Sequence, residues 1–336
     1  MENIKKQVVL NEAVCRTTVV IPNYNGIKYI EACLASVFAG SADVQVIVVD
    51  NASTDQSREF IEKKYAHCSN LTLISLPENT GFCHGVNVGI EAAKTEFVFL
   101  LNNDTTIDKD CIRHLETALD EDEKLFSVSA KMISMYYPDK LDDAGDFYSA
   151  LGWAFARGKD KPVSKYNKKD RIFSACAAGA LYRRDVFDEI GMFDEAHFAY
   201  LEDMDVGYRA NIFGYQNHFI PDAILYHAGS GVSGSRHNPF KVDLSARNSV
   251  YLIYKNMPFL QVVINLPFLL AGYFIKLLFF ARKKMGKTYI KSVVKGLKLS
   301  FSGEGRKKKI AFRWKNLPNY FWIQGQLWVS LVRRFF

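Results

Sequence analysis

The first hundred residues alternate short apolar runs with segments of helix-compatible spacing, and this alternation is the strongest constraint on the fold. The apolar runs are residues 17–21, 44–49, 71–75 and 96–101. Between them, residues 28–38, 57–65 and 82–93 have the spacing of helices with one apolar face. Strands that alternate with helices in this way predict an α/β fold whose central sheet is mainly parallel.

Polar residues follow these runs where the predicted strands end. They include Asn25 after the first run, Asp50 after the second and Asn102-Asn103-Asp104 after the fourth. The carboxyl ends of parallel strands share one edge of a sheet, and open α/β sheets bind ligands at that edge. Asn and Asp also favour turns, because their side chains bond to nearby backbone. The cluster is therefore a candidate ligand site, with ordinary turns as the alternative.

Asp50 and Asp104 are the candidate ligand-binding acids of this edge. An ionised Asp50 can accept the N3–H of a uracil or thymine ring, while DNASTD also suits a turn whose Ser53 or Thr54 caps the next helix. Asp104 is a candidate ligand for Mg²⁺ or Mn²⁺, which commonly bind one or two carboxylates together with substrate phosphates. His227, at the end of a later apolar run, is the second candidate metal ligand. Taken alone, each of the last two residues also suits a purely structural role.

Three acids surround a predicted helix start in YLEDMD, residues 200–205. Acids favour helix N-termini, and Asp205 has an i,i+4 partner in Arg209, so a structural role explains Asp205 well. That role explains Glu202 and Asp203 less fully. A carboxylate held ionised at a helix start can act as a general base toward a sugar hydroxyl.

Other site signatures are missing from the sequence or have a structural explanation. No G-x-G-x-x-G follows the first apolar run, no G-x-x-x-x-G-K-[ST] segment occurs, and the six cysteines include no C-x-x-C pair. Dinucleotide binding, a P-loop and a zinc site therefore have no support. Glycines 81, 85 and 89 recur at every fourth position, as close packing of a helix on a sheet requires. Asn79 and Asn87 beside them are placed to reach a sugar or a diphosphate.

Seven segments, in order, resemble the inverting family 2 glycosyltransferases of the GT-A fold, especially bacterial rhamnosyltransferase-like members. They are VVIPNYNG, VVDNASTDQS, ENTGFCHGVNVGI, FLLNNDT, AGALYRRDVFDEIGMFDE, YLEDMDVGYRANIFGY and ARNSVYLIYKN. The resemblance runs from about residue 17 to residue 256. It implies a GT-A nucleotide-sugar-binding fold and a reaction in which one general base, without a protein nucleophile, inverts the anomeric centre.

The resemblance also implies a role for each matching site residue. Asp50 binds the nucleotide base, Asp104 and His227 hold the metal, and Asp203 is the catalytic base. The other residues implied to contact the donor are Pro22, Tyr24, Asn25, Ser53, Asn79, Gly81, Phe82, Asn87, Asn102, Asn103 and Arg247. Those implied to contact the acceptor are Gly179, Ala180 and Glu202. The family's D-x-D element is incomplete here, because Asn102 replaces its first acid, so we expect the metal to enter mainly with the nucleotide diphosphate.

Charge divides the chain near residue 257. Residues 258–336 contain 16 Lys/Arg and one acid, whereas the first 257 residues contain 27 Lys/Arg and 35 acids. Such a basic tail indicates a polyanionic partner. Residues 258–275 carry no charge, and five lysines between residues 284 and 298 form a stripe beside an apolar helical face. The pattern favours an anionic membrane surface, reached by an interfacial or re-entrant segment, over nucleic acid. A helix packed on the body and an oligomer interface are the alternatives.

These features predict three regions: a nucleotide-sugar-binding half over residues 1–130, an acceptor-binding and catalytic half over residues 131–257, and a basic, membrane-associating helical tail over residues 258–336. We expect a metal-dependent, inverting glycosyltransferase at the cytoplasmic face of the membrane. Its donor would be dTDP-rhamnose or a UDP-sugar, and its acceptor a glycan or lipid-linked glycan of cell-surface polysaccharide synthesis. The alternatives are a nucleotidyltransferase and a non-catalytic adaptor that binds lipid or another polyanion.

Overall fold

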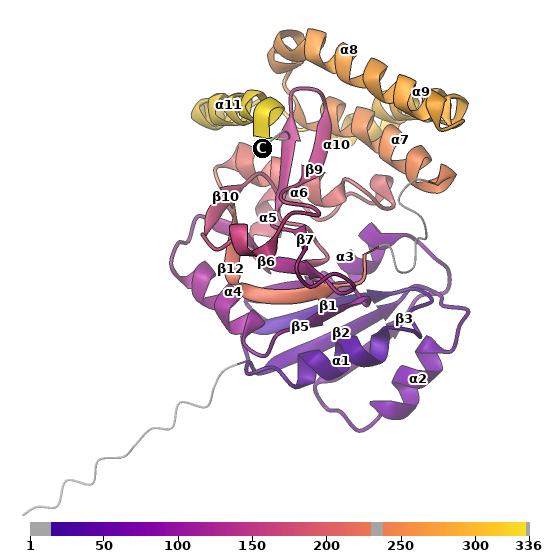
Figure 1. The fold of residues 1–336 in the computed structure, drawn as a ribbon, viewed down its shortest axis with the longest axis vertical. Coiled ribbons are helices and arrows are strands. Elements are labelled where there is room, and N and C mark those ends of the chain that lie inside the picture. Colours follow the sequence, from indigo (N-terminus) through magenta and orange to yellow (C-terminus); the bar gives the residue numbers. More distant parts are fainter. Residues whose placement is uncertain (1–14, 230–237, 334–336) are drawn as a thin grey trace, which may run out of the picture.

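A computed structural model describes residues 15–229 and 238–333 and has a ten-stranded central sheet (Figure 1). Its strands are β1 (Thr17–Asn23), β2 (Val44–Asp50), β3 (Leu71–Ser75), β4 (Phe97–Leu101), β5 (Thr105–Ile107), β6 (Leu125–Ser134), β7 (Leu141–Asp143), β10 (Asp170–Ile172), β11 (Gly179–Arg183) and β12 (Gln216–His227). The strand order is β10-β12-β6-β11-β4-β1-β2-β3, with β5 beside β12 and β7 beside β6. β1 to β4 are parallel, as predicted, and the antiparallel strand β11 lies between β4 and β6. The predicted α/β fold class is confirmed, and the sheet is mixed, because β5, β7, β10 and β11 pair antiparallel with their neighbours.

Helices cover both faces of this sheet. One face carries α1 (Ile30–Phe38), α2 (Ser57–Lys64) and α4 (Cys111–Asp120), and the other carries α3 (Phe82–Ala92), α5 (Val186–Ile190) and α6 (Glu202–Phe213). Alternate side chains of β4 pack on opposite faces of the sheet. Phe97 and Phe99 pack with α1, α2 and α4, and Val98 packs with α3, α5 and α6. A strand buried on both faces reads as a continuous apolar run, which is the pattern of residues 97–101. Gly89 of α3 allows close approach to the sheet, because a Cβ there would lie 2.2 Å from Val20.

Five further helices gather at the end of the molecule opposite α1 and α2 (Figure 1). They are α7 (Pro239–Asn256), α8 (Phe259–Arg282), α9 (Gly286–Phe301), α10 (Gly303–Lys308) and α11 (Leu317–Arg333). They hold a hairpin made of β8 (Asp146–Ser149) and β9 (Trp153–Ala156). Ala150 in its turn donates to the Leu327 carbonyl at 2.9 Å, and Trp153 donates to the Gly272 carbonyl at 3.3 Å. Tyr320, Ile323 and Leu327 of α11 belong to the main core. The change of charge at residue 257 is therefore not a boundary of the core.

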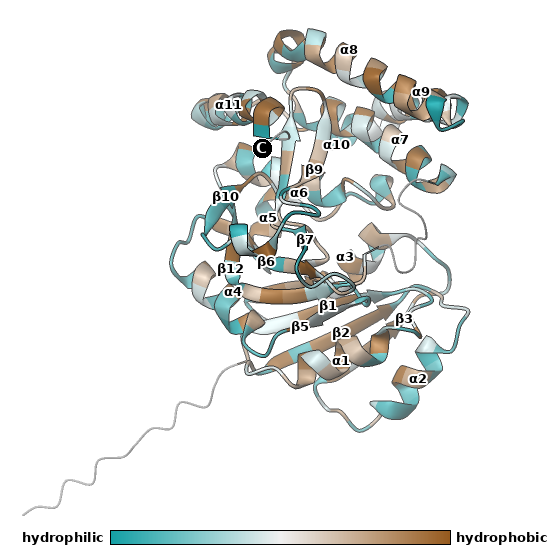
Figure 2. Cartoon of the chain, viewed as in Figure 1, coloured by the Kyte–Doolittle hydropathy of each residue, from teal (hydrophilic) through white to brown (hydrophobic). Residues whose placement is uncertain are grey.

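The uncharged segment 258–275 lies in α8, which buries one face and exposes the other. Gln261, Asn265, Leu269 and Gly272 are buried against the protein, and the Asn265 and Gln324 amides bond to each other twice at 2.9 Å. The rest of the helix exposes large apolar side chains, namely Phe259, Leu260, Val263, Ile264, Leu266, Phe268, Leu270, Phe274, Ile275, Leu278 and Phe279. Figure 2 shows the hydrophobic residues along this helix. Among the described residues, α8 is the one helix long and apolar enough to cross a membrane.

Replacing Leu327 by alanine tests whether α11 belongs to the core. Leu327 is fully buried, so we expect the free energy of unfolding to fall by ~2–5 kcal/mol, the usual cost of a Leu→Ala cavity. Urea denaturation followed by circular dichroism measures this change. Val329→Ala on the same helix is the control: Val329 is 46% exposed, and its loss should change stability by no more than about 0.5 kcal/mol. Equal stability of both variants would show that α11 is not part of the core.

Candidate active site

A cleft of about 930 Å³ opens at the edge of the sheet where β1, β4 and β12 end. Eleven of the site residues predicted from the sequence line it: Pro22, Tyr24, Asn79, Gly81, Phe82, Asn102, Asn103, Asp104, Glu202, Asp203 and His227. The predicted gathering of polar strand ends is thus present. Residues without a prediction complete the walls, chiefly Cys176–Ala178, the loop Phe198–Leu201 and the start of α7 at Pro239–Lys241.

Three residues predicted to contact the donor do not line the cleft but form hydrogen bonds within the loops beside it. The two oxygens of Asp50 accept from the Asn23 amide at 2.9 Å and from the Ser53 backbone N–H at 3.1 Å. Asn25 accepts from the backbone N–H of Thr54 at 2.7 Å. This is the turn arrangement that the sequence left open, and contacts of Asp50, Ser53 and Asn25 with a nucleotide remain predictions.

The capping role considered for Ser53 is wrong. α2 begins at Ser57, and the Ser57 N–H is bonded by the Asp55 carboxylate at 2.9 Å. The chain takes three more residues to turn into the helix than the DNASTD pattern suggested, and no side chain caps the helix at its N-cap residue, Gln56.

Four other predicted residues are engaged elsewhere in the fold. Asn87 donates to the Phe193 carbonyl at 2.8 Å, and Gly179 and Ala180 pair with β4 inside the sheet. Arg247 donates to two backbone carbonyls of the segment before Phe198, each at 2.8 Å. None of the four is among the residues that line the cleft, so their contacts with donor or acceptor stay predictions.

Asp104 and His227 meet at the cleft although they come from distant parts of the chain. Asp104 follows β4, His227 ends β12, and the pairing of His227 with Thr105 of β5 brings the two together. His227 Nε2 lies 3.3 Å from Asp104 Oδ1. Adjacent ligands of an octahedral Mg²⁺ or Mn²⁺ lie roughly 3 Å apart, given metal–oxygen distances of ~2.1 Å. The donor atoms therefore fit one divalent cation that faces the cleft.

Asp142 of β7 is a functional candidate that the sequence did not reveal. His227 Nδ1 lies 2.8 Å from Asp142 Oδ2, and Lys159 bonds to the other oxygen of Asp142. Burial alone would lower the pKa of His227, but its bonds to Asp104 and Asp142 outweigh burial and raise that pKa to about 9. A carboxylate on Nδ1 fixes the ring so that Nε2 faces a metal. The sequence signal for Asp142 was the acidic segment LDDAGD, residues 141–146, but this segment does not indicate a contact with His227.

Glu202 and Asp203 form the acidic wall of the cleft, in the first turn of α6. Burial raises the pKa of Asp203, while the backbone N–H of Met204, which donates to it at 2.7 Å, favours its ionised form. Burial and the neighbouring Asp203 charge raise the pKa of Glu202 to about 8. Where two neighbouring carboxyl groups have different pKa values, the one with the lower pKa can act as a base and the other as an acid. Asp203 is the member that ionises first.

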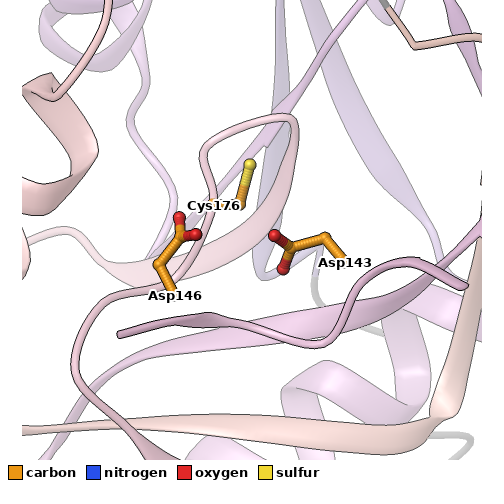
Figure 3. A group of neighbouring side chains, drawn as sticks. All are labelled: Asp143, Asp146 and Cys176. Carbon is orange, nitrogen blue, oxygen red and sulfur yellow. The ribbon is translucent and has the colours of Figure 1, made fainter. Parts of the chain in front are cut away.

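A second group of titratable side chains lies next to this wall, and one of its members, Cys176, also lines the cleft. Asp143, Asp146 and Cys176 bring their ligand atoms within 4.8 Å of one another (Figure 3). Burial raises the pKa of Asp143 to about 7 and places those of Asp146 and Cys176 well above their usual values. Mg²⁺ and Mn²⁺ prefer ionised oxygen ligands. This group and His227 must both lose a proton before they can hold a cation. Asp104 with His227 is the better metal site because both line the cleft, whereas Asp143 and Asp146 do not.

The loop before α6 is strained and is held by α7. Phe198, Tyr200 and Leu201 have φ values of 63°, 70° and 68°, in the left-handed region that costs non-glycine residues energy. The Asn248 amide donates to the carbonyls of His197, Ala199 and Tyr200 at 2.9, 2.9 and 2.7 Å. This clamp shapes the cleft wall directly beside Asp203. Asn248 lies in the segment ARNSVYLIYKN, but the sequence does not reveal this clamp, because the carbonyls that Asn248 contacts lie about fifty residues earlier in the chain.

A buried ion network fixes the other side of α6. Asp205 accepts from Arg209 and Lys255, both at 2.9 Å, and from Asn256 at 2.7 Å. Lys255 also donates to Asp194 at 2.7 Å. These cations hold the pKa of Asp205 far below its usual range despite complete burial. The structural role expected for Asp205 through Arg209 is confirmed.

Replacing Asp142 by asparagine removes the charge that faces His227. We expect Mn²⁺ binding to weaken 10–100-fold, the usual cost of losing such a partner. Electron paramagnetic resonance of free Mn²⁺, recorded with UDP or dTDP present, measures the affinity. Asp170→Asn is the control, because Asp170 is an exposed carboxylate that pairs with Arg157 outside the cleft. Unchanged Mn²⁺ affinity in Asp142→Asn would show that Asp142 does not position His227.

Known proteins share both the sequence pattern and the fold. The glycosyl transferase family 2 profile matches residues 18–191. The putative glycosyltransferase EpsH of Bacillus subtilis is 28% identical over 213 residues, which are 61% of this chain and 58% of EpsH. The N-acetylglucosaminyl-diphospho-decaprenol L-rhamnosyltransferase of Mycobacterium tuberculosis is 25% identical over 235 residues, which are 62% of this chain and 75% of that enzyme. The chain thus spans less than two thirds of the length of EpsH.

A solved structure supports the fold over nearly the whole chain. The mannosyltransferase PcManGT from Pyrobaculum calidifontis, in complex with GDP-Man and Mn²⁺, superposes with a TM-score of 0.54. The two are 17% identical, and the match covers 94% of this chain and 88% of that one. This likeness shows the fold alone. Because the family profile matches more than half of the 336 residues, the chain belongs to glycosyl transferase family 2.

Proposed function

We propose that the protein is an inverting, divalent-metal-dependent glycosyltransferase. It transfers a sugar from dTDP-rhamnose or a UDP-sugar to a hydroxyl of a glycan or lipid-linked glycan in cell-surface polysaccharide synthesis. The observation that carries this proposal is the arrangement of one cleft: Asp203 lines the same cavity as the Asp104–His227 pair. A base and a metal site in one cavity suit the displacement of a diphosphate by a hydroxyl.

Asp203 is the general base in this proposal. Its carboxylate takes the proton of the acceptor hydroxyl as the oxygen attacks the anomeric carbon from the face opposite the diphosphate. Glu202, with a pKa of about 8, stays mainly protonated at neutral pH and leaves the negative charge on Asp203. Mg²⁺ or Mn²⁺, held by Asp104 and His227, would offset the charge of the leaving diphosphate. One displacement at the anomeric carbon inverts its configuration.

The relatives support the chemical classes of donor, acceptor and metal. The Mycobacterium tuberculosis relative is named for transfer of L-rhamnose to a lipid-linked diphosphate sugar, and PcManGT was solved with GDP-Man and Mn²⁺. A lipid-linked acceptor also suits the apolar surface of α8. Because family 2 membership accounts for the nucleotide and metal features together, a nucleotidyltransferase has no separate support.

We further propose that α8 lies in the plane of the cytoplasmic membrane surface without crossing the bilayer. Asn265 of α8 is bonded to Gln324 and Trp328 of α11, and a Cβ on Gly272 would lie 2.2 Å from the Leu151 carbonyl. These contacts fix one face of α8 to the body along its length. A helix docked this way presents only its opposite, apolar face to lipid, as interfacial helices do. The exposed lysines of α9 add attraction to anionic headgroups.

The variant Asp203→Asn tests the base directly. A positioned general base contributes about 10²–10⁴-fold to rate, so we expect turnover to fall by that factor while Kd for the nucleotide sugar stays nearly unchanged. Coupled detection of nucleoside diphosphate measures turnover, and isothermal titration calorimetry measures binding.

Asp185→Asn is the control for that variant, because Asp185 precedes α5 and does not line the cleft. It should leave both turnover and binding at parental values. Near-parental turnover of Asp203→Asn would remove Asp203 from the mechanism, and joint loss of binding and turnover would give it a donor-binding role instead.

A further inference from the structure

An apolar groove of about 450 Å³ lies between α7, α8 and α9, outside the active-site cleft. It is lined by Val250 and Ile253 of α7, by Leu266, Leu269, Leu270, Tyr273, Phe274 and Leu277 of α8, and by Tyr289, Ile290, Val293, Val294 and Leu297 of α9. Its volume is within the range of small-molecule sites in proteins, about 300–1,000 Å³. The groove is therefore large enough to bind a ligand.

The lining offers a ligand no unpaired polar group. The two tyrosine hydroxyls of the lining are both used inside the protein: that of Tyr273 bonds to Ser249 at 3.1 Å, and that of Tyr289 donates to the Tyr273 carbonyl at 3.5 Å. An apolar cavity gives water few hydrogen-bond partners and favours hydrocarbon. The chemistry of the groove thus selects an apolar chain over a sugar, nucleotide or peptide backbone.

The mouth of the groove is continuous with the exposed face of α8. Leu270 and Phe274 line the groove and are also 63% and 60% exposed, and Val294 on the α9 side is 44% exposed. If α8 lies on the bilayer, a hydrocarbon chain can pass from the lipid into the groove without crossing water. This continuity argues for a lipid chain and against a soluble partner.

One helix links the groove to the active site. The start of α7, at Pro239–Lys241, lines the cleft, while Val250 and Ile253 farther along the same helix line the groove. At about 1.5 Å per residue, the ten residues from Phe240 to Val250 span about 15 Å. The groove therefore lies about 15 Å along α7 from the wall of the cavity that holds Asp203. This distance suits an acceptor whose chain and reacting sugar are joined by phosphate.

We propose that this groove seats the polyisoprenyl chain of a lipid-linked acceptor. The proposal rests on the proposed function and names where the acceptor's lipid binds. The chain leaves the bilayer beside α8, lies between α8 and α9, and directs the phosphate-linked sugar along α7 toward Asp203. A bulk phospholipid chain and a second copy of this protein are the other possible occupants, and either would contradict the proposal.

Photolabelling of the full chain on vesicles tests the assignment. The probe is a polyisoprenyl monophosphate with a diazirine in its chain, present in vesicles of phosphatidylcholine and phosphatidylglycerol. We expect mass spectrometry to find the label mainly within 266–277 and 289–297. Unlabelled polyisoprenyl monophosphate should displace it, and extra phosphatidylcholine should not. Equal displacement by phosphatidylcholine, label spread over α8 and α11, or cross-linked dimers would each overturn the proposal.

Two Val→Trp variants test whether the label reports binding in the groove. Val294→Trp fills the groove, and Val263→Trp adds the same side chain to the outer face of α8; the parent side chains are 44% and 48% exposed. Both variants should fold and bind vesicles, but only Val294→Trp should lose the label. Retention of the label in Val294→Trp, or its loss in both variants, would contradict the groove.

Glycosyl transfer is measured separately on the same proteins, so that a failure of the groove proposal can be distinguished from a failure of the proposed function. If the parent chain transfers sugar but is labelled outside the groove, only the groove proposal is refuted. Labelling within the groove by a chain that turns over no nucleotide sugar would refute the proposed function and leave the groove as a lipid site.

Discussion

The position of the acidic wall depends on the buried ion network around Asp205. Asp205 has no exposed surface and accepts from Arg209, Lys255 and Asn256, so it ties α6 to the end of α7. Removing one partner of a buried pair leaves an uncompensated charge and typically costs about 3–5 kcal/mol. Asp203 lies two residues before Asp205 on the same helix. The network therefore holds the proposed base in place. α7 also contributes Asn248, which bonds to the loop before α6, and part of the lining of the apolar groove.

Neighbouring carboxylates of this fold have opposite environments, and that difference separates their roles. Cations surround Asp205 and keep its pKa low, whereas Asp203 has backbone donors and burial, which leave its pKa raised. His227 lies between the Asp104 and Asp142 carboxylates, which supply the charge that a divalent metal would share. The cleft thus combines a carboxylate able to take a proton with a site able to hold a cation. These are the two requirements of the proposed displacement.

The sequence predicted local structure and strand-end chemistry better than side-chain partners. Residues 71–75 form β3 as predicted, and Asp104 and His227 meet because strand order brings distant strand ends to one edge. The donation of Arg247 to the Ala196 and His197 carbonyls was not predicted, because it depends on the path of residues 196–201, and its contact with the donor stays a prediction. Asp142 was missed for the same reason. Periodicity reports which face of an element is buried, but it does not report which residues from other elements lie against that face.

In the proposed reaction, the cleft transfers a sugar and releases a nucleoside diphosphate. Phosphorus NMR of the products, after the full chain is incubated with Mn²⁺, acceptor-bearing vesicles and a panel of dTDP- and UDP-sugars, tests it most directly. We expect one donor to yield nucleoside diphosphate and no pyrophosphate. We also expect proton NMR to show an inverted anomeric configuration in the transferred sugar. Release of pyrophosphate, or retention of configuration, would contradict the proposed reaction.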